Sequence, residues 1–155
     1  DRSVSRGLGD VYKRQDLRRI TVATNTLRDL TRIMDQEKEV SELICALNMD
    51  DLVVDDCIKQ QFSIAKEMIN LAIEAFVQKD EMAANQVIEM DIKADEQYNR
   101  AKEVYVDLLA KKEHDTGTLV DVLLVGKYLE RICDHCVNIG KWVLYQKSGI
   151  FEAIE

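Results

Sequence analysis

The chain has 155 residues, a length typical of one domain that buries its own core. Its formal net charge of −8 argues against non-specific binding to nucleic acid or to anionic lipid, because like charges repel. No apolar run is long enough to span a bilayer and no signal peptide is recognisable. We therefore expect a cytoplasmic protein that reaches a membrane only through partners, with its four cysteines reduced.

The first fifteen residues (1–15) differ from the rest of the chain because they show no sustained helical periodicity. We interpret them as a non-native or disordered tail, and residues 150–155 as a short C-terminal tail. The chain has no proline, the residue that most often breaks helices and marks long loops. Long helices joined by short turns are therefore expected.

Apolar residues at steps of three and four predict four helices, at about 17–47, 51–78, 81–111 and 118–146. The run 48–51 offers N-cap residues for the second helix and Asp80 for the third, while Ser148-Gly149 ends the fourth. Because short connections make neighbouring helices antiparallel, the predicted fold is all-α, an antiparallel up-down bundle of four long helices.

Each predicted helix has an apolar stripe that should face the core. In the first helix the stripe is Ile20, Ala23, Leu27, Leu30, Ile33, Met34, Val40, Leu43 and Ile44. In the second it includes Leu52, Cys57, Ile58, Phe62, Ala65, Met68, Ile69, Ala72 and Phe76. In the fourth it is Val122, Val125, Leu129, Ile132, Cys133, Cys136, Ile139 and Val143.

Two helices also carry a row of oxygen-bearing side chains at i, i+4 spacing, each in the order acid, acid, amide. The rows are Asp91, Asp95, Asn99 and Glu130, Asp134, Asn138. Like charges at this spacing destabilise a helix, and hard cations such as Mg²⁺, Ca²⁺, Mn²⁺ or ferric iron bind such oxygens and relieve the repulsion. The alternative is a solvated face on which Lys127 and Lys141 form exposed ion pairs of small value.

Other candidate sites are weaker. Cys133-x-x-Cys136 has no second cysteine pair to complete a zinc site, and both residues lie on the apolar face. The sequence contains no P-loop, dinucleotide-binding glycine motif, nucleophile elbow or zinc-protease motif. We therefore expect a protein that is not an enzyme.

The first and fourth helices share Leu-x-Arg-Ile-x-Asp in register, at Leu30 to Asp35 and Leu129 to Asp134. This is an internal repeat with a period of about a hundred residues. The second copy continues as Leu129-Glu-Arg-Ile-Cys-Asp-His-Cys-Val-Asn-Ile-Gly-Lys141. It closely resembles the hallmark of the PhoU family, approximately Leu-Glu-Arg-Ile-Gly-Asp-His-x-x-Asn-Ile-Ala-Glu, and the resemblance extends over about Leu17 to Gly149.

PhoU proteins consist of two tandem three-helix repeats. By this resemblance residues 16–48 are the last helix of a first repeat, residues 51–149 are a complete second repeat, and two earlier helices are missing. The resemblance also implies a metal site, with a multinuclear cluster of iron or of another cation (Mn, Mg or Zn). Its ligands would be Asp91, Asp95, Glu130 and Asp134, with weaker candidates Asn99, Asn138 and Asp35. The first copy departs from the motif, because Thr31 and Gln36 replace the glutamate and the histidine.

The resemblance implies a regulator of phosphate uptake and of the phosphate-starvation response. Such a protein is a metal-binding adaptor between the ATPase subunit of a phosphate ABC transporter and a phosphate-sensing histidine kinase. One alternative is a cytosolic domain of a sodium–phosphate membrane transporter, and another is a purely structural bundle. The apolar stripe of the first helix should be buried against the other three helices or in a homodimer.

Overall fold

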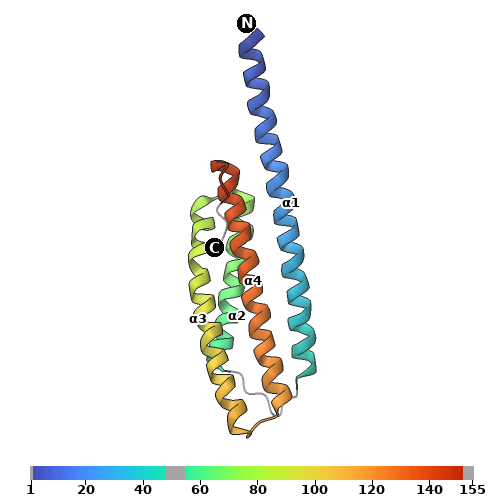
Figure 1. Ribbon diagram of the computed structural model, residues 1–155, viewed down its shortest axis with the longest axis vertical. Helices are drawn as coiled ribbons and strands as arrows, with labels where there is room; N and C mark the ends of the chain where they lie inside the picture. The colour runs from blue at the N-terminus through green and yellow to red at the C-terminus, as the bar shows by residue number, and fades with distance from the viewer. Residues whose placement is uncertain (1, 48–54, 152–155) are drawn as a thin grey trace.

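The computed structural model describes residues 2–47 and 55–151, with side chains described from Lys13 onward. The four helices are α1 (Arg2–Ala46), α2 (Asp56–Gln78), α3 (Glu81–Lys111) and α4 (Thr116–Ser148). They run up and down in alternation, and the N-terminal part of α1 extends beyond the other three (Figure 1). The antiparallel all-α bundle is therefore confirmed. No helix in the described ranges is both long and apolar enough to cross a membrane.

The helices do not form a square. Helices α2, α3 and α4 each contact the other two. Within the described residues, α1 packs against α4 and against no other helix. A cavity of about 380 Å³ lies where α1 and α2 flank α4, and Val40, Phe62 and Leu129 are among its lining residues. The fold is thus a three-helix bundle with a fourth helix added on one side of α4. The assignment of residues 16–48 and 51–149 to successive repeats stays a prediction.

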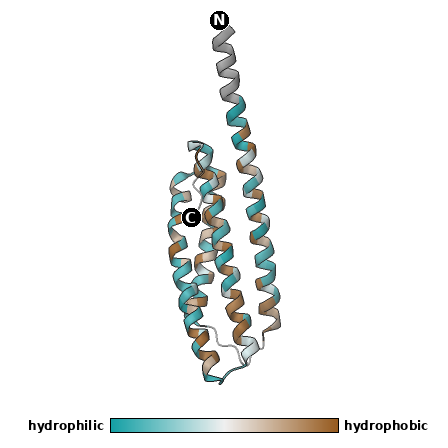
Figure 2. Ribbon diagram, in the orientation of Figure 1, coloured by the Kyte–Doolittle hydropathy of each residue, from teal (hydrophilic) through white to brown (hydrophobic). Residues whose placement is uncertain are grey.

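The core lies along α4. All eight side chains predicted for its inner face are buried, because α4 has a partner on three sides. Two buried glycines, Gly126 and Gly140, let it approach its neighbours closely. A Cβ at Gly140 would lie 3.0 Å from the Ala84 carbonyl oxygen, so the α3 and α4 backbones nearly touch there. Hydrophobic and hydrophilic residues alternate along each helix, as amphipathic packing requires (Figure 2).

The stripe predicted for α1 is partly wrong. The side chains that α1 buries are Val22, Thr26, Asp29, Ile33 and Val40. Of the predicted stripe, Ile20, Leu27, Met34 and Ile44 are exposed. The physical reason is that α1 carries apolar residues on two sides, and only the partner α4 decides which side is buried. A smaller error of the same kind is Phe62 of α2, which is 46% exposed beside the cavity.

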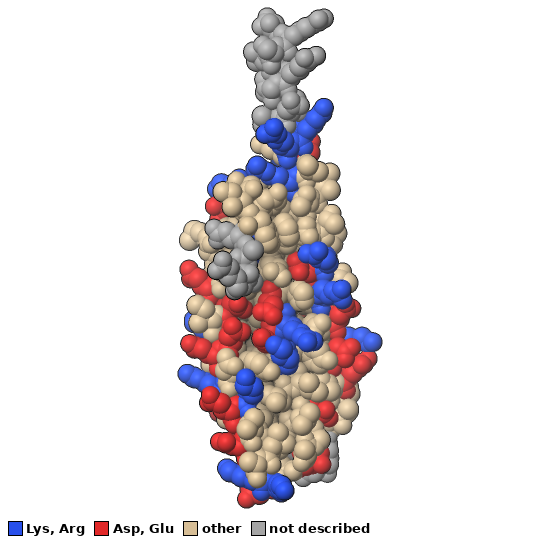
Figure 3. Space-filling model, viewed as in Figure 1, with Lys and Arg blue, Asp and Glu red and all other residues tan. Residues whose placement is uncertain are grey.

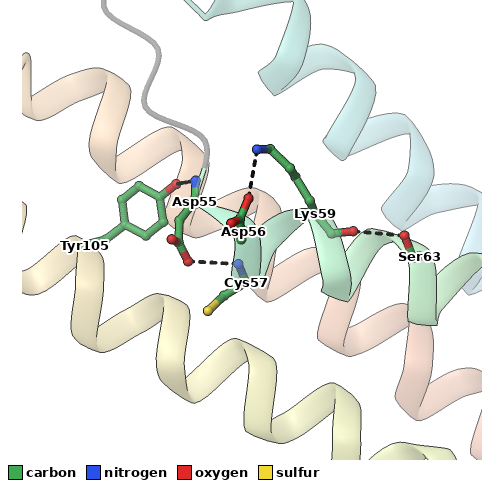
Figure 4. A network of polar contacts seen from close by, with 6 residues as sticks. All are labelled: Asp55, Asp56, Cys57, Lys59, Ser63 and Tyr105. Carbon is green, nitrogen blue, oxygen red and sulfur yellow. Dashed lines mark hydrogen bonds and ion pairs between the residues drawn. The ribbon is translucent and has the colours of Figure 1, made fainter.

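Helix ends follow the expected capping chemistry, with corrections at the starts of α2, α4 and α1. The N-cap of α2 is Asp55 and not a residue of 48–51, a run that lies outside the described residues. The Asp55 carboxylate accepts a hydrogen bond from the Cys57 N–H at 2.9 Å, and the Asp55 N–H donates to the hydroxyl of buried Tyr105 on α3 at 3.1 Å (Figure 4). This cap therefore also fixes the start of α2 against α3.

The other boundaries lie near those predicted. Asp80 caps α3 as expected. Helix α4 begins two residues early at Thr116, because Asp115 caps it and shortens the turn. Gly149 ends α4 with φ 73°, a conformation that favours glycine. Helix α1 begins at Arg2 and not near Leu17, so the segment interpreted as a tail is assigned to the helix that projects from the bundle.

Candidate metal-binding site

The two acid rows come together at the interface of α3 and α4. Asp91 and Asp95 lie on α3, and Glu130 and Asp134 lie on α4, which packs along it. Glu130 and Asp134 both act electrostatically on Asp91, and Glu130 also acts on Asp95. The structure therefore brings together the four acidic residues that the sequence predicted as a set.

Asp91 has the most perturbed carboxyl group of the four. Burial, followed by repulsion from Asp95, Asp134 and Glu130, raises its pKa from 3.8 to about 6. One of its oxygens, Oδ1, is buried and has no hydrogen-bond partner. A buried carboxylate oxygen without a donor is costly, so this group is suited to a cation or to a proton.

The neighbouring carboxyl groups show the same trend. Asp95 and Asp134 keep exposed side chains, so only partial desolvation acts on them. It raises the pKa of Asp95, with repulsion from Glu130 adding to it, and raises the pKa of Asp134, with Glu130 and Asp95 as further causes. Acidic side chains gather over the middle of the bundle with basic side chains among them (Figure 3). The region is thus one of concentrated and only partly compensated negative charge.

Two lysines contribute positive charge beside these carboxyl groups. Lys127 forms an ion pair with Glu130, whose side chain is 17% exposed, and its ammonium also lies 5.4 Å from the centre of the Tyr98 ring. Lys141 lowers the pKa of Asp91. The ion pairs expected for a solvated face are therefore partly present, although Lys127 is held by two groups at once.

The donor set suits a hard cation in its chemistry, since it consists of carboxylate oxygens at one helix interface. Its present side-chain positions do not form a closed site. Among the described side chains, no three His, Cys, Asp or Glu residues converge closely enough to hold a metal ion. Binding would require carboxylates to turn toward one another, which mutual repulsion opposes until a cation is present.

The weaker candidates occupy different environments. Asn138 is half-buried on α4 and Asn99 is exposed on α3, at the ends of their rows. Asp35 is exposed on α1 and pairs with Arg32 of the same helix at 3.6 Å. Asp35 is thus separate from the acidic group between α3 and α4.

The cysteines of α4 are packing residues in this structure. Cys133 and Cys136 are free and fully buried. Burial raises the pKa of both thiols, that of Cys136 to about 12, so the reactive thiolate form is suppressed at neutral pH.

One polar contact was not foreseen from the sequence. Asp29 of α1 is 3% exposed, and its Oδ1 lies 3.0 Å from Nδ1 of His135 on α4. Its second oxygen is buried without a partner. The spacing in the sequence could have indicated it. Asp29 lies seven residues after Val22 and four before Ile33, so it falls on the same face of the helix as these two residues. The contact joins α1 to the helix that carries Glu130 and Asp134.

Comparison with known proteins gives a consistent result. The model of the PhoU domain matches residues 58–143. A phosphate-specific transport system accessory protein PhoU homolog from Clostridium acetobutylicum is 27% identical over 138 residues, which are 87% of this chain and 62% of that protein. The homolog from Xylella fastidiosa is 30% identical over 139 residues, 87% of this chain and 58% of that protein.

Solved structures share the fold. The phosphate transport system regulatory protein PhoU from Streptococcus pneumoniae aligns with a TM-score of 0.81 at 20% identity, over 90% of this chain and 67% of that one. PhoU from Pseudomonas aeruginosa aligns with a TM-score of 0.80 at 24% identity, over 88% and 66%. The chain spans about three fifths of the length of the curated relatives described above.

Proposed function

This chain belongs to the PhoU family, and from that membership we propose that it is a regulatory accessory protein of phosphate transport. The matched residues include α3, most of α2 and α4, and all four acidic residues of the candidate site. The curated relatives are described as accessory proteins of the phosphate-specific transport system, which supports a regulatory role. We propose in addition that the chain is not an enzyme and acts in the cytoplasm.

We further propose that the protein binds a cation between α3 and α4. Asp91, Asp95, Glu130 and Asp134 would hold it, with Asn99 and Asn138 at the ends of the rows. The unpartnered Oδ1 of Asp91 is the observation that carries this proposal. The cation, iron or another metal such as Mn, Mg or Zn, would neutralise the repulsion that raises the pKa of these carboxyl groups.

Calorimetric titration with Mn²⁺ or Fe³⁺ tests the metal site. The double variant Glu130→Ala/Asp134→Ala should lose binding, because it removes both acids that α4 contributes. The matched control is Glu103→Ala/Asp107→Ala, two exposed acids of α3 at the same i, i+4 spacing. The control should bind as the wild type does. Equal binding by all three proteins would overturn the proposed site.

The adaptor role is a proposal about partners. We propose that the exposed helical faces contact the ATPase subunit of a phosphate ABC transporter and a phosphate-sensing histidine kinase. Co-purification of the chain with each partner, both taken from its own host, is the direct test. Capture of either one supports the proposal, and failure with both contradicts it whether or not the protein binds metal.

A further inference from the structure

A cavity of about 320 Å³ lies at the end of the bundle from which the N-terminal part of α1 projects. Helices α1, α3 and α4 and the turn between α2 and α3 supply its walls, and basic side chains gather there (Figure 3). We call this cavity the basic pocket, and its polar lining includes Arg18, Arg19, Lys79, Glu81, Gln146 and Lys147. Its charge is opposite in sign to the formal net charge of −8 of the whole chain.

Two of the cations are held in place from different parts of the chain. Arg18 of α1 is half-buried, and its guanidinium lies against Gly149, the residue that ends α4. Lys79 ends α2 in the left-handed conformation with φ 56°, and its N–H donates to the Ala75 carbonyl oxygen. The packing of α1 on α4 therefore brings together an arginine and a lysine that are far apart in the sequence.

The negative charge around the basic pocket pairs with the other two cations. Lys147 forms an ion pair with Glu81. Arg19 lies 3.7 Å from Asp16 of the same helix, and both side chains are more than 60% exposed, so this pair contributes little. None of the ion pairs between described residues includes the arginine beside Gly149 or the lysine that ends α2. Two cations of the pocket are thus left without an acidic partner.

The ends of the helices account for only part of this positive charge. Helices α2 and α4 both have their C-termini here, and each helix C-terminus is equivalent to about half a negative charge. Together they amount to about one charge, which is less than the two unpaired cations. The nearby Asp80 carboxylate accepts from the Met82 and Ala83 N–H groups and so serves the first turn of α3. Positive charge therefore remains for a ligand.

The donors of the basic pocket suit a phosphate group. The planar guanidinium of Arg18 can donate two parallel hydrogen bonds to two phosphate oxygens, and the Lys79 ammonium adds a point charge. The Gln146 amide supplies a neutral N–H donor. The volume lies at the small end of the range for ligand sites, which favours a small anion over a large organic molecule.

We propose that the basic pocket binds a phosphate group, either as a free anion such as diphosphate or as an exposed phosphate monoester. This site is separate from the proposed cation site. On α4 the pocket begins at Val143, nine residues and about 13 Å beyond Asp134. The proposal therefore rests neither on cation binding nor on the proposed protein partners.

Calorimetric titration of the full chain with sodium diphosphate, in metal-free buffer of low ionic strength, tests the site. The wild type should bind with a Kd of about 10–100 µM. Arg18→Gln/Lys79→Gln should bind at least about tenfold more weakly, because it removes both unpaired cations. Helical circular dichroism should be unchanged, since both side chains lie at the surface of helix ends.

The matched control is Arg28→Gln/Lys112→Gln. It also removes one arginine of α1 and one lysine that ends a helix with φ 56°, and it changes the net charge equally, but neither residue lines the pocket. The control should bind diphosphate as the wild type does. Glu130→Ala/Asp134→Ala should do so too, which separates this test from that of the cation site.

A second arm distinguishes the source of the phosphate group. Flotation with phosphatidylcholine vesicles that contain phosphatidic acid presents a phosphate monoester on a lipid surface. Binding of diphosphate that depends on Arg18 and Lys79 supports a soluble anion, and vesicle binding alone with the same dependence supports a lipid headgroup. Absence of binding in both arms, equal weakening by the two charge-matched double variants, or loss of binding in Glu130→Ala/Asp134→Ala would each overturn the proposal.

Discussion

Helices α1 and α4 carry the same Leu-x-Arg-Ile-x-Asp motif in opposite surroundings. Ile33 and Ile132 occupy matching positions and are both buried, but within the part of the chain that the structure describes α4 has three neighbouring helices and α1 has one. The comparison teaches that a shared motif fixes which residue points inward. The number of neighbours then decides how much of the remaining helix surface is covered.

The acids of the motif differ in their neighbours. Both are exposed, but Asp35 on α1 pairs with Arg32, whereas the pKa of Asp134 on α4 is raised by partial desolvation and by the nearby Glu130 and Asp95. The same residue type at the same motif position is therefore an ordinary surface charge in one helix and a candidate ligand in the other.

The largest expected effect comes from the matched isoleucines. Ile132→Ala should lower the free energy of unfolding by about 3–4 kcal/mol, because the cavity would lie at the centre of the bundle. Ile33→Ala should cost about 2–3 kcal/mol, since α1 can shift on its single partner. Urea unfolding measures both, and a larger loss for Ile33→Ala would contradict the comparison.

The second prediction concerns the two aspartates of α1. Asp29→Asn should destabilise the protein by about 1–2 kcal/mol, because it weakens a charge-assisted contact with His135 and leaves a polar group buried. Asp35→Asn is the matched control on the same helix and should change stability by less than about 0.5 kcal/mol. Equal effects in chemical denaturation would show that the α1–α4 contact contributes little.

The third prediction tests the acidic environment beside α4. In the folded chain the pKa of Asp91 is about 6, above its ordinary 3.8, so the folded state binds more protons between these values. Stability should therefore fall as pH rises through this window. In metal-free buffer Asp91→Asn should raise stability by about 1–2 kcal/mol at neutral pH, after allowance for solvent screening.

The same variant carries its own control in its pH dependence. Below about pH 3, well under the ordinary pKa of 3.8, Asp91 is mostly protonated in both states and the advantage of Asp91→Asn should disappear. Thermal unfolding at a series of pH values measures this. A gain that is independent of pH would mean that packing, and not charge, is responsible.

The smallest effect is expected where α1 meets the end of α4. Gly149→Ala should cost about 1 kcal/mol, because φ of 73° is unfavourable for alanine. Its Cβ would also clash with the Arg18 guanidinium of α1, which must move aside. Differential scanning calorimetry resolves the loss. A neutral result would show that the helix end relaxes freely.

Periodicity predicted most of the fold because it depends on local spacing. The inner face of α4, the turn at 79–80 and the cap at Asp80 were all foreseen. Spacing also predicted the two acid rows, but it could not show that they meet, since that depends on how α3 and α4 pack. The Asp29–His135 contact was missed because its residues are more than a hundred positions apart in the chain.

The sequence alone therefore determined four helices, their order and the residue types on each face, because hydrophobic spacing and capping are local properties. Only the tertiary structure decided which of the two apolar rows of α1 is buried. The two rows are similar in spacing. Val22 and not Leu27 points inward because, within the described residues, α1 packs on α4 and turns the row of Val22 toward it. The row of Leu17, Ile20, Leu27 and Met34 is left exposed as the consequence of that choice.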